Sequence, residues 1–154
     1  MNNYTTSLES SHFPVMLNEV IKISSPSKGG IYIDCTFGAG GYSKQLLKFS
    51  KTKVKGLDRD SKVKEIGIKL EKNYPLRFKF HQTTFSQINS VTKDLVDVII
   101  FDLGLSSIQL NDLDRGFSFK SNENLDMSMG LNEISARDVI NAASELELKL
   151  IIKI

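Results

Sequence analysis

Four strand-like segments alternate with helix-like segments between residues 29 and 104, and this alternation limits the possible folds more than any other feature. The strand-like segments are short, apolar and rich in β-branched residues, whereas the segments between them carry apolar residues at helical spacing. The expected strands cover residues 29–37, 53–58, 77–82 and 96–104, and the expected helices cover residues 41–50, 61–74 and 85–91. This order predicts an α/β fold with a parallel sheet of right-handed βαβ units, whose strands are buried on both faces.

Further helices are expected outside the alternating region. One covers residues 14–23, with Pro14 in its first turn. Its apolar face comprises Met16, Val20 and Ile23. Residues 104–132 are loop-like, and two short helices follow them. Their starts are marked by serine–acid pairs that fit the N-terminal capping pattern, Ser135 with Asp138 and Ser144 with Glu147.

The composition is that of one globular domain. The chain has 154 residues, of which 40% are hydrophobic and 25% charged. It has no apolar run of about 18 residues, so no membrane span is expected. Its first residues lack the basic and apolar regions of a secretory signal, and we expect a cytoplasmic location. A single cysteine, Cys35, excludes a disulfide framework and a cysteine-based zinc cluster, and we expect no metal site.

Charge is distributed unevenly along the chain. The net charge is +2, but residues 44–81 contain 12 Lys or Arg against 4 Asp or Glu, a local excess of +8. The rest of the chain therefore carries a charge of −6. Such asymmetry is typical of a surface that faces nucleic acid, but lysines on solvated helix faces produce the same count. Both interpretations stay open.

Three carboxylates and one aromatic residue follow the expected strands. Asp34, Asp58 and Asp102 lie at or near the carboxyl ends of the first, second and fourth strands, and Phe85 follows the third. Ligands of open α/β sheets bind beyond the carboxyl ends of the strands, near the point where the strand order reverses. We therefore expect these four residues to border one ligand site.

The glycine-rich stretch "DCTFGAGGYS" (residues 34–43) indicates the class of ligand. Asp58 lies 20 residues beyond Gly38, a spacing that suits a carboxylate accepting hydrogen bonds from a ribose diol. A dinucleotide site has the pattern Gly-x-Gly-x-x-Gly, but Ser43 takes the place of the third glycine, and no lysine directly follows the glycines as in a phosphate-binding loop. S-adenosylmethionine has a ribose and no phosphate, and acidic residues suit its positive charge. The pattern therefore favours a methyl-donor site.

Longer motifs make the chain similar to a known family. It resembles the bacterial MraW-type family, which methylates N4 of a cytosine in small-subunit ribosomal RNA. The segments that carry the resemblance are "HFPVMLNEV", "GIYIDCTFGAGGYS", "GLDRD", "FHQTTFSQI", "VDVIIFDLGLSSIQLNDLDRGFSF" and "LDMSM". They extend from about His12 to the C-terminus. The resemblance implies a class I, Rossmann-like methyltransferase fold and S-adenosylmethionine as the cofactor. The implied partner is small-subunit ribosomal RNA or the assembling small ribosomal subunit.

The resemblance also implies a set of donor-binding residues. They are Gly40, Gly41, Tyr42, Asp58, Phe85, Asp102 and Gln109. The backbone around the first three would contact the methionine end of the donor, Asp58 would hold the ribose, and Phe85 would lie by the adenine. Asp102 and Gln109 would complete the pocket. We add Asp34 as a contact to the amino group of the donor.

Transfer to cytosine requires a hydrogen-bond acceptor for its exocyclic amine, whose lone pair is delocalised into the ring. Asp102 and the main-chain carbonyls after it are the candidates, and both stay open. The target base must also be unpaired or flipped out and stacked on an aromatic ring. Phe117 and Phe119 either provide that ring or fill local core. Arg115 either makes a bidentate contact to RNA phosphate or forms an internal salt bridge.

The resemblance predicts how the chain divides. Residues 1–106 are expected to form the N-terminal part of the Rossmann-like domain, and residues 107–154 a loop and the start of a helical insertion. Because family members are longer, we expect an incomplete sheet whose fourth strand has an exposed edge. On this interpretation the chain is a truncated form that binds the donor weakly and methylates nothing alone. The exposed edge would meet a missing C-terminal half or a second copy.

Two other functions use the same residues. A non-catalytic RNA-binding or assembly module would use the basic stretch. Its RNA affinity would fall steeply as salt concentration rises, and Asp58→Ala would leave it unchanged. A nicotinamide-dinucleotide-binding oxidoreductase fragment is disfavoured by the missing third glycine. Titration with S-adenosylhomocysteine and with NAD distinguishes the methyl-donor site from this dinucleotide-binding alternative.

Overall fold

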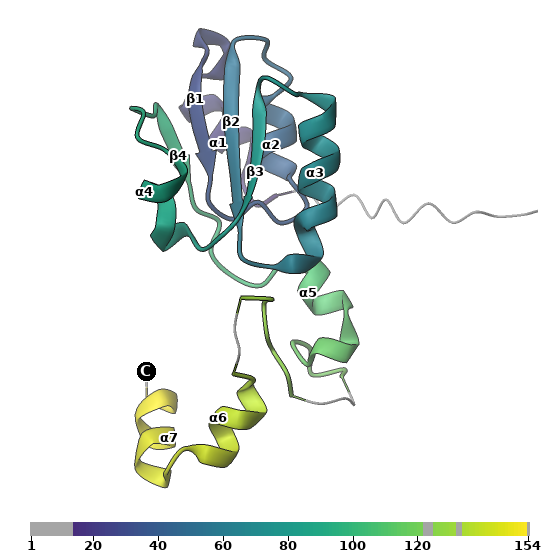
Figure 1. The fold of residues 1–154 in the computed structure, drawn as a ribbon, viewed down its shortest axis with the longest axis vertical. Helices are drawn as coiled ribbons and strands as arrows, with labels where there is room; N and C mark the ends of the chain where they lie inside the picture. Colours follow the sequence, from purple (N-terminus) through teal and green to yellow (C-terminus); the bar gives the residue numbers. More distant parts are fainter. Residues whose placement is uncertain (1–13, 122–124, 132–133, 154) are drawn as a thin grey trace, which may run out of the picture.

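A four-stranded parallel sheet is the central element of residues 14–104, in the upper part of the view in Figure 1. The structure is a computed structural model that describes residues 14–121, 125–131 and 134–153. The strands are β1 (Gly30–Asp34), β2 (Thr52–Asp58), β3 (Phe78–Gln82) and β4 (Val98–Ile100). They lie in the order β3-β2-β1-β4, and every pair of neighbours is parallel. The predicted α/β architecture is therefore confirmed.

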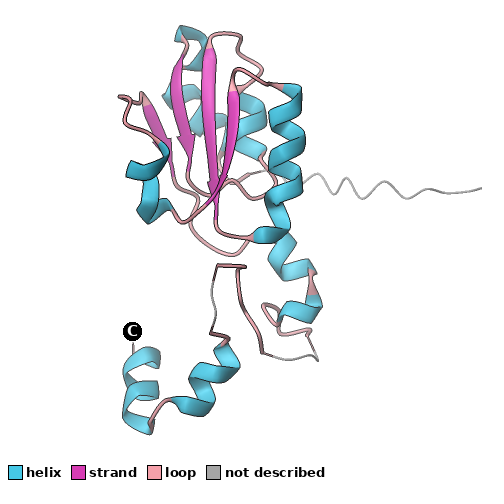
Figure 2. Cartoon of the chain, viewed as in Figure 1, coloured by secondary structure: helices cyan, strands magenta, loops and turns pink. Residues whose placement is uncertain are grey.

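Short helices connect and flank the strands, and two more lie away from the sheet towards the C-terminus (Figure 2). They are α1 (Leu17–Ser24), α2 (Gly41–Leu46), α3 (Lys64–Asn73), α4 (Ile88–Val91), α5 (Ser107–Asn111), α6 (Ala136–Ala142) and α7 (Glu145–Ile152). Single 3-10 turns η1 (Pro26–Lys28), η2 (Ser61–Val63), η3 (Phe85–Gln87) and η4 (Leu113–Arg115) supplement them. The predicted caps of α6 and α7 are confirmed, since both helices begin with a serine–acid capping box. Across the described ranges, the helices are too short or too polar to cross a bilayer.

The two faces of the sheet are covered unequally. On one face, helices α1, α2 and α3 pack around a core that includes Tyr32, Phe37, Leu46, Val54 and Phe80. On the other face, a small cluster of Ile33, Cys35 and Leu57 packs against Ile88, Val91 and Val96. Strands β2 and β3 each begin with a buried, an exposed and a buried residue. The prediction of strands buried on both faces therefore holds where Leu57 packs in this cluster, and it is wrong for Lys53 of β2 and Lys79 of β3, which are exposed.

Helix α1 begins later than predicted. Met16 has a left-handed backbone with φ 52°, so Pro14 lies before the helix and outside its first turn. The side chains that pack on the core are Leu17, Val20 and Ile21, whereas Met16 and Ile23 are exposed. The helix is thus rotated relative to the predicted apolar face, of which only Val20 contacts the core.

A helix that was not predicted follows β4. Residues 104–132 were expected to be a loop, but α5 and η4 form within them. A capping box starts α5: the Ser106 hydroxyl accepts from Gln109 N at 3.2 Å, and the Gln109 side-chain oxygen accepts from Ser106 N at 2.9 Å. The Ser-x-x-Gln spacing was present in the sequence, and it is the signal that could have revealed this helix.

Candidate functional site

A cavity of about 660 Å³ opens beyond the carboxyl ends of β1, β2 and β4. The strand order reverses here, because β1 is followed along the chain by β2 on one side and pairs with β4 on the other. Open α/β sheets bind ligands at this point, and the volume is typical of small-molecule and cofactor pockets. Of the four predicted strand-end residues, Asp58, Phe85 and Asp102 line the cavity and Asp34 does not.

The turn after β1 uses its glycines in two ways. A Cβ atom added to Gly38, which has φ 50°, would meet no atom closer than 3.8 Å, so this position keeps the cavity wall open. A Cβ on Gly40, at φ 77°, would lie 2.8 Å from the ring of Phe37, and one on Gly41 would lie 2.2 Å from Pro14. Gly40 and Gly41 therefore allow tight packing of the turn. Gly38, which was not among the predicted site residues, is the glycine of the turn that leaves open space beside it at the cavity wall.

Asp58 ends β2 with its carboxylate fixed by two main-chain N–H groups. Gly38 N donates to one carboxylate oxygen at 2.8 Å, and Asp60 N donates to the other at 2.9 Å. Burial raises the pKa of Asp58, and these backbone hydrogen bonds oppose the rise. Each carboxylate oxygen can accept more than one hydrogen bond, so Asp58 retains acceptor capacity at the cavity wall. A carboxylate oriented in this way suits a pair of neighbouring hydroxyls.

Asp34 lies behind the cavity wall. Its side chain is 0% exposed, and one carboxylate oxygen accepts from the Ser43 hydroxyl at 2.7 Å. Burial raises the pKa of Asp34 to about 6, against the hydrogen bonds from Ser43 and Thr36. The structure thus places Asp34 between β1 and α2, where it supports the glycine turn and is shielded from a ligand in the cavity.

Asp102 and Tyr42 lie together where β4 ends. Asp102 is exposed, and its main-chain N–H donates to the Thr36 hydroxyl at 2.8 Å. The Tyr42 hydroxyl donates to the Val15 carbonyl at 2.5 Å, and the Asp102 carboxylate lies 3.4 Å from the same hydroxyl oxygen. Burial, together with the Asp102 charge, raises the pKa of Tyr42 to about 12. Tyr42 is therefore a neutral donor that ties the segment before α1 to the cavity rim.

Phe85 stands at the cavity rim after β3. Its ring is 46% exposed and lies edge-on to the ring of Phe101, with the centroids 5.5 Å apart and an interplanar angle of 87°. Such an edge-to-face pair is a favoured aromatic geometry. Phe101, which was not predicted as a site residue, thus supports the orientation of Phe85.

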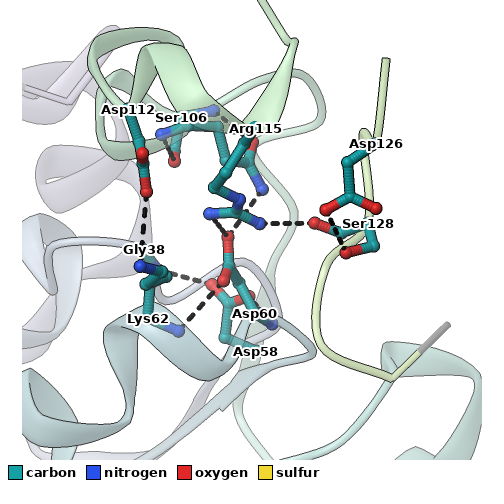
Figure 3. Close-up of polar contacts among 10 residues, drawn as sticks. Gly38, Asp58, Asp60, Lys62, Ser106, Asp112, Arg115, Asp126 and Ser128 are labelled. Carbon is teal, nitrogen blue, oxygen red and sulfur yellow. Dashed lines mark hydrogen bonds and ion pairs between the residues drawn. The ribbon is translucent and has the colours of Figure 1, made fainter. Parts of the chain in front are cut away.

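Gln109 and Arg115 meet at Asp60, a residue that the sequence interpretation did not single out. Figure 3 shows Arg115 against Asp60. Asp60 is 1% exposed, and its Oδ2 accepts from Gln109 Nε2 at 3.1 Å and from Arg115 Nη1 at 2.9 Å. Burial alone would raise the pKa of Asp60. The hydrogen bonds from Arg115, Lys62 N and Gln109 outweigh that effect, so its pKa is lowered. The Asp-x-Asp spacing after β2 is the signal that could have identified it.

The three residues predicted to contact RNA have different environments. Arg115 is 8% exposed and forms the internal salt bridge that was the second of its two interpretations. Phe117 is also 8% exposed, and its ring lies 5.0 Å from the Arg115 guanidinium carbon, so it fills local core. Phe119 is fully exposed. Of the three, Phe119 alone presents a free ring in this structure.

The sheet order, the cavity at the strand reversal and the fixed carboxylate after β2 define a Rossmann-like α/β domain. A solved structure has the same fold: the C-terminal domain of precorrin-6Y C5,15-methyltransferase from Rhodobacter capsulatus matches with a TM-score of 0.50. It is 18% identical, and the match covers 64% of this chain and 53% of that chain. At this identity, the likeness shows the fold alone.

The chain belongs to the MraW methylase family, whose model matches residues 9–154. One relative is the ribosomal RNA small subunit methyltransferase H of Rickettsia massiliae (strain Mtu5), 46% identical over 139 residues, which are 90% of this chain and 45% of the relative. The protein of the same name from Ehrlichia ruminantium (strain Welgevonden) is 41% identical over 147 residues, covering 92% of this chain and 49% of the relative. The predicted family is therefore confirmed. The chain spans about half the length of the curated relatives it matches.

Proposed function

We propose that the cavity binds S-adenosylmethionine and that the chain supplies the donor-binding part of a methyltransferase acting on N4 of a cytosine in small-subunit ribosomal RNA. The observation that carries the proposal is the Asp58 carboxylate, held at the cavity wall by Gly38 N and Asp60 N with acceptor capacity left over. The family assignment and the names of the relatives support the reaction class. The donor would supply an electrophilic methyl group.

The residues present fit such a donor. Asp58 would accept hydrogen bonds from the ribose hydroxyls, and the exposed face of the Phe85 ring would lie by the adenine. The open side of Gly38 leaves the backbone of the turn accessible to the methionine end. Gly40, Gly41 and Tyr42 would act indirectly, by allowing the turn to pack and by holding Val15 at the rim. Gln109 would act through its bond to Asp60.

The Asp102 carboxylate is our proposed acceptor for the cytosine amine. It is exposed at the cavity, and its main chain is anchored by Thr36. An acceptor at this place would hold the amine by a hydrogen bond and favour a pyramidal nitrogen with an available lone pair. The neutral Tyr42 hydroxyl lies 3.4 Å from the same carboxylate and limits its orientation. Among the RNA contacts, the exposed ring of Phe119 is the candidate for base stacking.

We also propose a division of the chain near residue 106. The alternating α/β pattern ends with β4, and the capping box of α5 begins at Ser106. Helices α6 and α7 have no buried residue among those described, which suits the start of a separate insertion. On this proposal, residues 1–106 form the donor-binding part, and residues 107–154 begin the part that holds RNA.

The basic stretch of residues 44–81 gives little support to the alternative function, a non-catalytic RNA-binding module. Several of its cations have partners within the chain: Lys55 pairs with Asp94, Lys62 with Asp112 and Lys79 with Glu71. Arg77 donates to the carbonyls of Leu47 and Phe49. These cations are engaged within the chain, and the rest of the stretch consists largely of exposed lysines.

Calorimetric titration of this chain with S-adenosylhomocysteine and with NAD tests the proposal. We expect S-adenosylhomocysteine to bind and NAD to give no heat of binding. Asp58→Ala should weaken the binding of S-adenosylhomocysteine by about tenfold or more, because it removes the acceptor of two hydrogen bonds from the ribose. Asp94→Ala, which removes an exposed carboxylate in the loop before β4, is the matched control and should leave the affinity unchanged. Equal affinities for the Asp58→Ala variant and the parent chain would contradict the assignment.

A further inference from the structure

A buried ion pair joins the turn after β2 to the chain that follows β4 (Figure 3). We call residues 106–121 and 125–130 the docked segment. Asp60 receives hydrogen bonds from both sides of this junction: Lys62 N of its own turn donates to Oδ1 at 3.0 Å, whereas Gln109 and Arg115 of the docked segment donate to Oδ2. Both charged side chains are almost fully removed from solvent, with 9% of Arg115 and 2% of Asp60 exposed.

Arg115 is also the centre of the docked segment itself. Its Nη2 donates to the Ser128 carbonyl at 2.6 Å, and its own carbonyl accepts from Met127 N at 2.8 Å. The guanidinium lies over the Phe117 ring. One planar side chain therefore holds η4, the stretch around Ser128 and the turn after β2 in a single arrangement. Only a guanidinium can donate in two directions from a fixed fork in this way.

The same junction borders the candidate donor site. Asp60 N donates to the Asp58 carboxylate, so the residue that anchors the docked segment also orients the proposed ribose acceptor. A Cβ atom added to Gly130 would lie 2.7 Å from the Ser61 hydroxyl, which shows that the docked segment packs directly on this turn. Ser106, Gln109 and Met129 of the docked segment line the cavity.

We infer that Asp60 and Arg115 form a positioning pair that couples donor binding to the docking of this segment. The inference rests on the proposed function, because the ligand it concerns is the donor. With the segment docked, one wall of the cavity is complete and Asp58 is oriented, so the ligand binds more tightly. By thermodynamic linkage, a bound ligand must then stabilise the docked segment by the same factor.

A purely structural ion pair would behave differently. Its loss would lower the stability of the whole domain, but the molecules that remain folded would bind ligand as before. The coupling is therefore tested by ligand affinity and by ligand-dependent protection of the docked segment, measured on folded protein. Hydrogen exchange resolves the second quantity segment by segment.

The test uses Arg115→Lys with Lys62→Ala as its control. Arg115→Lys keeps the charge, but one ammonium group cannot reproduce the forked contacts to Asp60 and to the Ser128 carbonyl. Lys62→Ala removes a second ion pair between the same two regions, Lys62 with Asp112, in which the Lys62 side chain is 60% exposed. Exposed pairs contribute little, so this variant should resemble the parent chain. S-adenosylhomocysteine is the ligand, and hydrogen exchange is followed in the docked segment and in β1 and β2.

We expect S-adenosylhomocysteine to increase protection of the docked segment in the parent chain and in Lys62→Ala. Arg115→Lys should bind about tenfold more weakly and lose the ligand-induced protection, while β1 and β2 stay protected. If Arg115→Lys does not fold, Asp60→Asn takes its place, since it keeps the shape of the side chain and removes the charge. Unchanged affinity together with unchanged ligand-induced protection in the folded variant would overturn the inference and leave the proposed function standing. A parent chain that binds no S-adenosylhomocysteine would overturn both.

Discussion

Asp34 shows how a single buried carboxyl group makes the stability of this fold depend on pH. Burial raises its folded-state pKa from 3.8 to about 6. Between these two values the folded protein binds the proton more tightly than the unfolded chain does. The contribution of Asp34 to stability is therefore greatest below its unfolded pKa and is lost as the pH rises through about 6.

Asp34→Asn is predicted to remove this dependence. The amide has a similar shape and does not titrate, so the variant should gain stability relative to the parent chain as the pH rises from about 4 to about 7, by roughly 1–3 kcal/mol. Urea unfolding of both proteins across this range measures the difference. Ser43→Ala is the companion variant: it removes a hydrogen bond that lowers the pKa of Asp34, so the loss of stability should move to higher pH. A constant offset between the parent and Asp34→Asn curves would refute the prediction.

At this scale, the sequence predicted which residues approach the site better than it predicted what they contact. Asp58, Phe85 and Asp102 line the cavity because parallel strands end at one edge of the sheet, a consequence of strand order. The inward orientation of Asp34 and the bond from Asp60 N to Asp58 depend on the backbone angles of turns. Spacing along the chain does not determine those angles.

Helix α3 packs on β3 through a position where only a glycine fits. Gly67 is buried, and a Cβ atom there would lie 2.3 Å from the nearest ring atom of Phe80. Phe80 cannot withdraw freely, because its ring also packs against Phe37 with the centroids 5.2 Å apart. The close approach of helix and strand therefore depends on the missing side chain.

Gly67→Ala is predicted to destabilise the domain. Alanine favours the helix by about 1 kcal/mol, but overpacking of a core contact costs about 1–3 kcal/mol. Three Phe80 ring atoms lie within 2.8 Å of the added atom, so we expect the clash to dominate and the urea midpoint to fall. The substitution should cost less in a Phe80→Leu background, where the ring is absent. A Gly67→Ala chain that is more stable than its parent would show that the gain in helix propensity outweighs the cost of overpacking.

Among the elements, periodicity located the four strands and the helix at α3 but not every helix boundary. The expected apolar face of Val63, at the end of η2, and of Ile66 and Leu70 in α3 lies in the core. Helix α1 was misplaced because the left-handed Met16 has no signature in the sequence. Helix α5 was missed because its polar, five-residue sequence has no apolar periodicity, and only its capping box indicates it.

At the scale of the whole molecule, the two edges of the described sheet differ in chemistry. Strand β3 is one edge, and Lys79 is exposed on it. Strand β4 is the other edge, pairing only with β1, and its region exposes Ile99, Phe101 and Leu103. A charged edge resists pairing with other chains, whereas an apolar edge favours it. The expectation that β4 is an exposed edge is met among the described residues. What pairs with the β4 edge stays a prediction.

We predict that this chain self-associates through β4 and that Ile99→Lys suppresses the association. Ile99 is 44% exposed and does not line the cavity, so the lysine should block edge pairing and leave S-adenosylhomocysteine affinity unchanged. Leu95→Lys is the matched control, because Leu95 is 95% exposed but lies in the loop before β4. Sedimentation velocity over a range of protein concentrations measures the association. The edge assignment fails if the parent chain stays monomeric throughout, or if Leu95→Lys suppresses association as strongly as Ile99→Lys, since general surface hydrophobicity would then explain the contact.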